Sequence, residues 1–403
     1  MTTPVDPTVP SDTHTDSAAL IVIGGGPAGR SAAAAYREAG GAGRVVLITA
    51  EDTPPYRRPP LSKGFLSGEV GEEEMPQRPA TDYDDQDIEL WLSEPVSGLD
   101  TDARRVTTAS GREITYDAVV LATGCAAAVL PVDGGDHPAV ATLRSLDDGR
   151  FLRTAAGSAR RAVVIGSGFI GCEAAATLAR RGVDVTMVTS EELPQLQRLG
   201  RDVAERIAGW LTTAGVAVVS SAPVRRIDPD GAVVTDDGSH RGDLVLAALG
   251  VTPNSALAGA AGLELSDDGR ILVDASMATA VPGVFAAGDV VMAENATAGR
   301  RLRVEHWGEA DRMGTIAGRS AAGVADRWTD VPGFWSTIGD RSLQYKSWGD
   351  GYDAVEVVDH GDGAFTAWYS ADGVAVGVLT HEADDDYEKG AELIAAGSPA
   401  PTG

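Results

Sequence analysis

Cysteine is scarce in this chain, and its scarcity excludes disulfide-rich folds. Of 403 residues only two are cysteines, Cys125 and Cys172. Two cysteines cannot form a disulfide framework, and these two do not have the C-x-x-C spacing of a redox or metal motif. We therefore expect two ordinary buried thiols.

Long apolar runs and an excess of positive charge are missing as well. No apolar run reaches the ~20 residues of a membrane span, and the N-terminus lacks the basic region and apolar core of a signal peptide. We therefore expect a cytoplasmic location. Lys and Arg number 33 against 59 Asp and Glu, a net charge of −26. Such a field repels nucleic acid and anionic membranes, which disfavours both as partners.

The length and composition are those of a globular enzyme with two or three domains. Hydrophobic residues make up 43% and charged residues 23%, and there are 49 glycines, which favours many tight turns. Residues 1–17 are rich in Thr, Asp, Pro and Ser, which predicts a disordered arm, with order starting at Ala18.

A strand–turn–helix–strand pattern occurs twice. An apolar run at 19–23 leads into a glycine turn at 24–29, a helix to about Ala39 and a strand at 44–49. The continuous apolar run predicts a parallel strand covered on both faces. The second copy has a strand at 161–165, a turn at 166–171, a helix at 172–181 and a strand at 183–189.

Both turns have the spacing of a dinucleotide-binding motif. We expect Gly24 to make the tight turn, Gly26 to let the backbone approach a pyrophosphate, and Gly29 to let the helix pack on the strand. The helix N-terminus would attract the phosphates. Glu51 follows 22 residues after Gly29 (51 − 29), where a carboxylate can hold ribose hydroxyls.

The second turn is interpreted in the same way, with Gly166, Gly168 and Gly171 in the three glycine positions. Glu191 stands where Glu51 stands in the first copy. A carboxylate there binds a free 2′-hydroxyl and repels a 2′-phosphate, which favours NADH while leaving NADPH possible. Two sites predict two dinucleotides, one a tightly held flavin and the other a diffusing nicotinamide.

Several further segments resemble a known family. The run 54–63, PPYRRPPLSK, resembles the flavin-side signature of the ferredoxin reductases of oxygenase systems. These belong with the putidaredoxin and rubredoxin reductases and the apoptosis-inducing-factor-like flavoproteins of the FAD-dependent pyridine nucleotide-disulfide oxidoreductase superfamily. The likeness runs from about residue 18 to 397, with further matches at 122–124, 250–254, 283–289, 305–307 and 334–336.

The resemblance implies a role for several side chains. Arg58 would contact FAD phosphates, and Lys63 would lie by flavin N5, paired with Glu173. A cation there favours reduced flavin, and the carboxylate offsets the cost of burying the ammonium. Trp307 would lie against the flavin or near the electron exit. Contacts to the rest of the cofactor would come from Thr123, Gly124, Gly288 and Asp289.

The resemblance also implies the domain order, because the segment around Gly288 and Asp289 belongs with the first glycine turn. We expect an α/β protein with two Rossmann-like dinucleotide-binding domains, one inserted in the other, and a small C-terminal α+β domain. The FAD-binding domain would comprise 18–129 and 253–327, and the NAD(P)H-binding domain 130–252. The small domain at 328–397 would hold strands at 354–358, 364–370 and 374–380 and a helix from Asp384 to about Ala396.

The predicted function is an FAD-dependent reductase that passes electrons from NADH to a ferredoxin- or rubredoxin-like protein. The segment 61–66 lacks the redox cysteine of the disulfide reductases, so a thiol relay is not expected. No metal site is expected either. Two alternatives are direct reduction of a small acceptor, such as a quinone or oxygen, and an NADH-sensing flavoprotein of the apoptosis-inducing-factor type.

Docking of the acceptor is the least specified part of this prediction. Ferredoxins are acidic, so a chain of this charge needs a locally basic face to bind one. Arg300, Arg301 and Arg303 form the candidate patch, against the alternative of a solvated loop. After 334–336 the family pattern continues with an acidic–amide–aromatic run, whereas this chain has Thr337-Ile338-Gly339-Asp340, which leaves the acceptor open.

Overall fold

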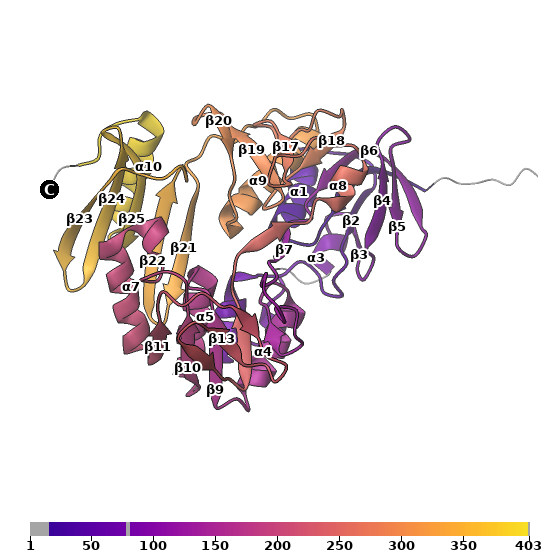
Figure 1. Ribbon diagram of the computed structural model, residues 1–403. Helices are drawn as coiled ribbons and strands as arrows, with labels where there is room; N and C mark the ends of the chain where they lie inside the picture. Colours follow the sequence, from indigo (N-terminus) through magenta and orange to yellow (C-terminus); the bar gives the residue numbers. More distant parts are fainter. Residues whose placement is uncertain (1–15, 78–80, 402–403) are drawn as a thin grey trace, which may run out of the picture.

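The computed structural model describes residues 16–77 and 81–401. Residues 1–15 of the predicted disordered arm lie outside the described residues. Ser17 already belongs to the first strand, one residue before the predicted start of order. Figure 1 shows three units: the first glycine turn belongs to the unit on the right, the second to the unit at the bottom, and the C-terminal sheet lies on the left.

The first unit is built on a sheet whose central strands are parallel. The strand order is β3-β2-β1-β6-β5-β4, and β18 pairs with the C-terminal half of β6. β4 and β5 form an antiparallel hairpin that extends the N-terminal half of β6. The strands are β1 (Ser17–Ile23), β2 (Val45–Ile48), β3 (Ile88–Trp91), β4 (Val96–Asp100), β5 (Arg105–Thr108), β6 (Glu113–Leu121) and β18 (Val284–Ala286).

Two long helices pack against each other beside this sheet, α1 (Pro27–Glu38) and α9 (Trp307–Ala321). The two helices approach closely, and only glycine fits at the contact: a Cβ on Gly314 would collide with the backbone of Ala28, and one on Gly318 with the backbone of Ala32. The rest of the unit consists of η1 (Pro59–Ser62), α2 (Gly64–Ser67), η2 (Glu72–Glu74), α3 (Thr81–Asp84), α8 (Ala256–Ala260) and a small sheet of β17 (Ile271–Val273), β19 (Val291–Asn295) and β20 (Arg300–Leu302).

The second unit repeats the parallel plan, with strand order β11-β10-β9-β15-β8. Its strands are β8 (Val140–Ala141), β9 (Arg161–Ile165), β10 (Asp184–Val188), β11 (Val216–Val219) and β15 (Leu244–Ala247). Its helices are α4 (Leu146–Ala156), α5 (Phe169–Arg180), α6 (Leu196–Leu199) and α7 (Arg201–Thr213). An antiparallel trio, β12 (Arg226–Ile227), β13 (Val233–Thr235) and β14 (Gly238–His240), adjoins it, and β7 (Cys125–Ala127) pairs with β16 (Val251–Pro253) where the chain passes between the units.

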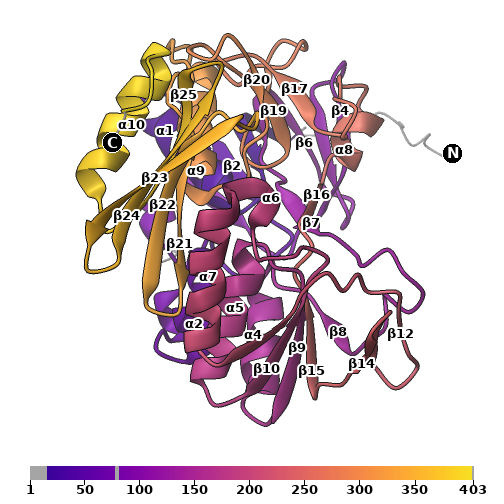
Figure 2. The ribbon, with the colours of Figure 1, turned by 60° about the vertical axis from the view of Figure 1, so that its left-hand side comes forward.

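The C-terminal unit is an antiparallel sheet in the order β21-β22-β25-β24-β23. Its elements are β21 (Gly333–Ile338), β22 (Arg341–Ser347), β23 (Ala354–Gly361), β24 (Ala364–Ala371), β25 (Val374–His381) and α10 (Asp384–Ala396). Phe365 and Tyr369 of this sheet share a core with Val203 and Ile207 of α7, which fixes the sheet against the second unit (Figure 2).

The predicted fold class is confirmed: two dinucleotide-type α/β units and a small α+β unit. The C-terminal sheet is larger than predicted, because β21 and β22 were not expected as strands. In the part of the chain that the structure describes, no helix combines the length and apolar character of a membrane span.

Candidate functional site

A cavity of about 1540 Å³ opens where the three units meet. Both glycine turns line it, as do residues of β21 and of the first turn of α9. Small-molecule sites usually measure roughly 300–1,000 Å³. This cavity is therefore larger than a usual site for one small molecule and has room for two dinucleotides.

The first turn has the geometry that the spacing predicted. Gly24 has φ +124°, and a Cβ there would collide with the carbonyl oxygen of Ala122. A Cβ on Gly29 would collide with the carbonyl oxygen of Gly24, whereas one on Gly26 would meet nothing within 4 Å. Gly26 is also the N-cap of α1 and supplies no side-chain cap. The helix start is thus open to the cavity, as a phosphate cradle requires.

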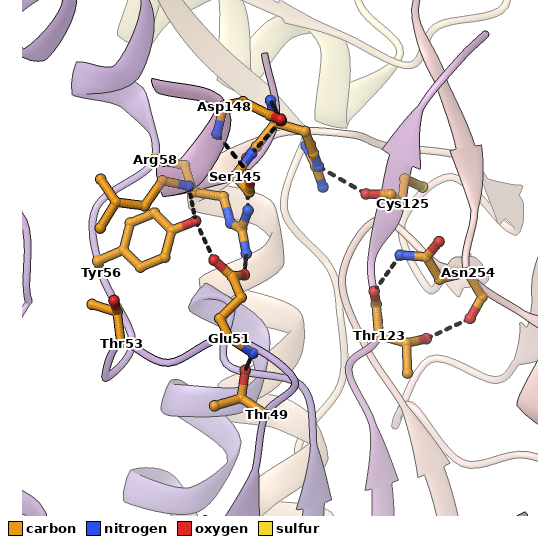
Figure 3. A network of polar contacts seen from close by, with 12 residues as sticks. Thr49, Glu51, Thr53, Tyr56, Arg58, Thr123, Cys125, Ser145, Asp148 and Asn254 are labelled. Carbon is orange, nitrogen blue, oxygen red and sulfur yellow. Dashed lines mark hydrogen bonds and ion pairs between the residues drawn. The ribbon is translucent and has the colours of Figure 1, made fainter. Parts of the chain in front are cut away.

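A polar network beside this turn connects the residues that were predicted to contact the ribose and the phosphates (Figure 3). The Glu51 carboxylate accepts hydrogen bonds from the Tyr56 hydroxyl and from Arg58, both at 2.7 Å. Arg58 also donates to the backbone oxygen of Arg144, and Tyr56 accepts from the backbone N–H of Leu146. The network therefore joins the first unit to the start of α4 in the second.

The Thr-Gly turn and the 250–254 run, which the resemblance identified separately, are in contact. Thr123 Oγ1 donates to the Asn254 backbone oxygen at 2.8 Å, and Asn254 Nδ2 donates to the Thr123 backbone oxygen at 2.9 Å (Figure 3). Thr123 and Gly124 line the cavity. These bonds fix the point where the chain crosses between the units.

Asp289 follows Gly288, whose φ is +83°, and its carboxylate faces the cavity beside an arginine that the sequence did not reveal. Arg144 Nη2 lies 2.6 Å from Asp289 Oδ2 and donates through Nε to the Cys125 backbone oxygen. Burial opposes the charge of Arg144, but the neighbouring Asp289 carboxylate raises the pKa of Arg144 on balance. Arg144 stands in no motif, so only the tertiary structure brings it to the site.

The second turn repeats the geometry of the first. Gly166 has φ +98°, and a Cβ on it would collide with the Ala248 carbonyl oxygen. A Cβ on Gly171 would collide with the carbonyl oxygen of Gly166, and one on Gly168 would meet nothing within 4 Å. The middle glycine again faces the open cavity, which fits a second dinucleotide.

Two buried polar atoms near the second turn lack partners. Glu191 Oε2 and Gln195 Nε2 have no hydrogen-bond partner among the described residues, and both side chains line the cavity. Buried polar groups are normally paired. An unpaired acceptor and an unpaired donor on the wall of one cavity suit a ribose, whose hydroxyls both donate and accept.

Lys63 and Glu173 form an ion pair on the cavity wall. Lys63 Nζ lies 2.6 Å from Glu173 Oε2, and Glu173 is 3% exposed. Ser62, Ser336 and the backbone of Thr337 also donate to this carboxylate. Lys63 lies between η1 and α2, so the pair joins the first unit to α5 of the second, and the resemblance implied this pairing. Its role beside a flavin stays a prediction.

Aromatic side chains form the wall around the start of α9. Trp307 is half-buried and lines the cavity, and His306 stacks on Phe334 with ring centroids 4.2 Å apart. Burial lowers the pKa of His306 to about 4, so this imidazole is neutral near pH 7. Trp335, which points to the other face of β21, is 50% exposed at the rim.

The two cysteines are buried and free. Burial raises the pKa of Cys125 to about 11 and that of Cys172 further. Thiols with such values carry almost no nucleophilic thiolate near pH 7. In the described part of the chain, no cluster of His, Cys, Asp or Glu is arranged to hold a metal ion.

The arginine patch is less basic than its sequence suggests. Arg300 pairs with Asp350, and Arg303 lies 3.4 Å from Asp268. Arg301 is exposed on β20, with no ion pair found among the described residues. Most of the predicted positive charge is therefore compensated locally.

Comparisons with known proteins agree with this geometry. The pyridine nucleotide-disulphide oxidoreductase family matches residues 18–314. The ferredoxin–NAD(+) reductase component of the anthranilate 1,2-dioxygenase system of Burkholderia cepacia is 34% identical over 366 residues, 88% of each chain.

Two solved structures are similar along almost the whole chain. A ferredoxin reductase from Rhodopseudomonas palustris has a TM-score of 0.89 and 31% identity, covering 96% of each chain. The covalent putidaredoxin reductase–putidaredoxin complex has a TM-score of 0.88 and 28% identity, covering 95% of this chain and 94% of that one. The predicted resemblance is thereby confirmed.

Proposed function

We propose that this chain, which belongs to the pyridine nucleotide-disulphide oxidoreductase family, is an FAD-dependent reductase that carries electrons from NADH to a ferredoxin- or rubredoxin-like protein. The observation that carries the proposal is that both glycine turns and the Lys63–Glu173 pair line one cavity. Bound FAD would supply two-electron uptake from NADH and one-electron release.

The residues of the first unit would hold and orient the FAD. Gly26 leaves the start of α1 open to its phosphates, and Arg58 adds a planar, permanently charged donor. Glu51 and Asp289 would accept from its hydroxyls. In the structure these carboxylates are paired with Arg58 and Arg144, so the charged groups are already positioned.

The second unit would bind the nicotinamide dinucleotide at Gly168 and Glu191. The unpaired Glu191 oxygen accepts from a free 2′-hydroxyl and would repel a 2′-phosphate, which supports NADH over NADPH. Lys63 would keep a positive charge on the wall, while Phe334 and His306 limit the access of water.

Two features support an iron–sulphur acceptor over a disulfide. No cysteine occurs between Leu61 and Leu66, and Cys125 and Cys172 are buried with raised pKa values. The relative of the anthranilate dioxygenase system is named a ferredoxin–NAD(+) reductase. A cytoplasmic location is also proposed, since free thiols suit a reducing compartment.

One observation favours a small-molecule acceptor as a second candidate. The net charge of −26, with Arg300 and Arg303 compensated by Asp350 and Asp268, disfavours the approach of an acidic protein. A quinone would not experience this repulsion.

A single experiment separates these functions. The purified protein is expected to show a flavin spectrum that bleaches when NADH is added without oxygen. Cytochrome c reduction should then require an added oxygenase-type ferredoxin. Bleaching followed by turnover only with a quinone would support the second candidate, and absence of flavin after reconstitution with FAD would overturn both.

The Lys63→Met variant tests the role of Lys63 in the proposed mechanism. It keeps the length of the side chain but removes the charge, so flavin reduction in a single turnover should slow while FAD is retained. Unchanged single-turnover kinetics would remove Lys63 from the proposed mechanism.

A further inference from the structure

Glu173 is a buried carboxylate at which all three units meet. Its Oε2 accepts from Ser62 Oγ at 2.5 Å and from Lys63 Nζ at 2.6 Å, both in the first unit. Its Oε1 accepts from Ser336 Oγ at 2.7 Å and from the Thr337 backbone N–H at 3.3 Å, both on β21. The second unit thus supplies the carboxylate and the other two supply the donors.

Lys63 depends on Glu173 for its position. The Lys63 ammonium has two other acceptors, the Pro59 backbone oxygen and Ser62 Oγ, each at 3.3 Å. Both contacts are long compared with the 2.6 Å bond to Glu173. A charge-assisted bond of this length is the strongest of the three and sets where the ammonium lies.

Ser336 is the donor that holds the far side of this carboxylate. It is 1% exposed and occupies an inward-facing position of β21, between Phe334 and Ile338, where an apolar side chain would be usual. Burying a hydroxyl is costly unless it finds a partner. Without it, Oε1 would keep only the long bond from Thr337, and the carboxylate could turn.

We propose that Ser336 is a positioning residue for hydride transfer, which it serves by holding Glu173 and, through it, the Lys63 ammonium on the cavity wall. The inference rests on the proposed function. It means that the C-terminal unit, which supplies none of the glycine turns, still sets the placement of the charge at the point where the two dinucleotides would meet.

The kinetic test uses Ser336→Ala, Ser336→Thr and a matched control, Ser342→Ala. Ser342 lies opposite Thr337 on β22, is exposed, and pairs with Thr337 Oγ1 rather than with Glu173. Losing one bond to a charged group should slow anaerobic flavin reduction by NADH about tenfold in Ser336→Ala. Ser336→Thr keeps the hydroxyl and should stay within about threefold of wild type, and Ser342→Ala should match wild type.

A double-mutant cycle distinguishes positioning from a general loss of structure. In the Lys63→Met background there is no ammonium to place, so Ser336→Ala should slow the reaction by less than about twofold further. A merely structural role would give the full loss again. If Ser336→Ala does not fold, Ser336→Cys fills the same space with a weaker donor and takes its place.

A spectroscopic test is independent of activity. The chain has only three lysines, Lys63, Lys346 and Lys389, so protein labelled with ¹³C at lysine Cε gives a simple spectrum in which Lys63→Met identifies one signal. Ser336→Ala should move the Lys63 signal and leave the other two, whereas Ser342→Ala should move none.

The outcomes separate the inference from the function on which it rests. A wild-type protein whose flavin is not reduced by NADH overturns both. A wild-type protein that is reduced, with Ser336→Ala equally fast and the Lys63 signal unmoved, overturns the inference alone. Additive losses in the cycle would likewise assign Ser336 a structural role.

Discussion

We predict that Glu191 determines the choice between NADH and NADPH. Its Oε2 is buried without a partner in the described structure, and a free ribose hydroxyl would satisfy it. Glu191→Ala should therefore lower kcat/KM for NADH about tenfold, mainly by raising KM. The ratio of kcat/KM for NADH to kcat/KM for NADPH should fall as well. Steady-state kinetics with both dinucleotides measures this change.

Glu192 provides the control for this prediction. It is the next residue, but its carboxylate is exposed and pairs with Arg201 on the surface. Glu192→Ala should leave both kcat/KM values unchanged. If Glu191→Ala leaves the NADH preference intact, the preference originates elsewhere in the cavity.

The first glycine turn separates folding from binding within one element. A Cβ on Gly26 meets nothing within 4 Å, so Gly26→Ala should lower the melting temperature of the apoprotein only by the small cost of alanine at the N-cap of α1. The added methyl would enter the space that a pyrophosphate needs and should weaken FAD binding about tenfold or more. Thermal melts and FAD titration measure the two effects.

Gly24 gives the opposite result in the same turn. Gly24 has a φ of +124°, and a Cβ there would collide with the Ala122 carbonyl oxygen, so Gly24→Ala should impair folding itself. This variant should be destabilised even without FAD. A Gly26→Ala protein that melts as early as Gly24→Ala would refute the division of roles within the turn.

The start of α9 contains a carboxyl group that couples stability to pH. Glu309 accepts from Trp328 Nε1 and from the Gly333 backbone N–H, and burial raises the pKa of Glu309 to about 7. The folded state therefore binds a proton more tightly than the unfolded state, in which the pKa is near 4.5. The contribution of Glu309 to stability is then greatest below about pH 4.5 and declines until about pH 7.

Glu309→Gln removes this titration. The stability of the variant relative to wild type should rise by up to about 3 kcal/mol between about pH 5 and about pH 8. Denaturant titrations at the two pH values measure the difference. Glu392→Gln, on the exposed side of α10, should show no such change, and a Glu309→Gln curve parallel to wild type would contradict the prediction.

At the level of elements, the sequence predicts those turns, helices and strands that a short continuous segment determines by itself. The two glycine turns were predictable because each places strand, turn and helix within a few residues, and a Cβ at Gly24 or Gly166 is excluded by neighbouring backbone. Lys63 and Glu173 are 110 residues apart, and only family resemblance paired them. The contacts of Arg144 and Ser336 could not be predicted from a short segment, since their partners Asp289 and Glu173 come from other units. β21 was not predicted because it buries the polar Ser336 and exposes Trp335, and β22 was not predicted because only Leu343 and Tyr345 mark its alternation.

The charge of the whole molecule controls how an acceptor protein approaches. At −26 the chain repels an acidic ferredoxin, and the ion pairs of Arg300 with Asp350 and Arg303 with Asp268 remove most of the compensating patch. Salt shortens the range of this repulsion, to about 8 Å at physiological ionic strength. The kcat/KM for an acidic ferredoxin should therefore rise with salt.

Replacing all three arginines with glutamine makes this prediction sharper. The change removes three positive charges and leaves Asp350 without its cation, whereas Asp268 keeps Arg270. Ferredoxin turnover should therefore fall at low salt and rise more steeply with salt than in wild type. Flavin reduction by NADH, measured in the same buffers, is the control for an effect on the cavity, because Arg303 lines it whereas Arg300 and Arg301 do not. A kcat/KM that falls with salt in wild type would instead demonstrate a locally basic docking face, and loss of that slope in the triple variant would assign the face to these arginines.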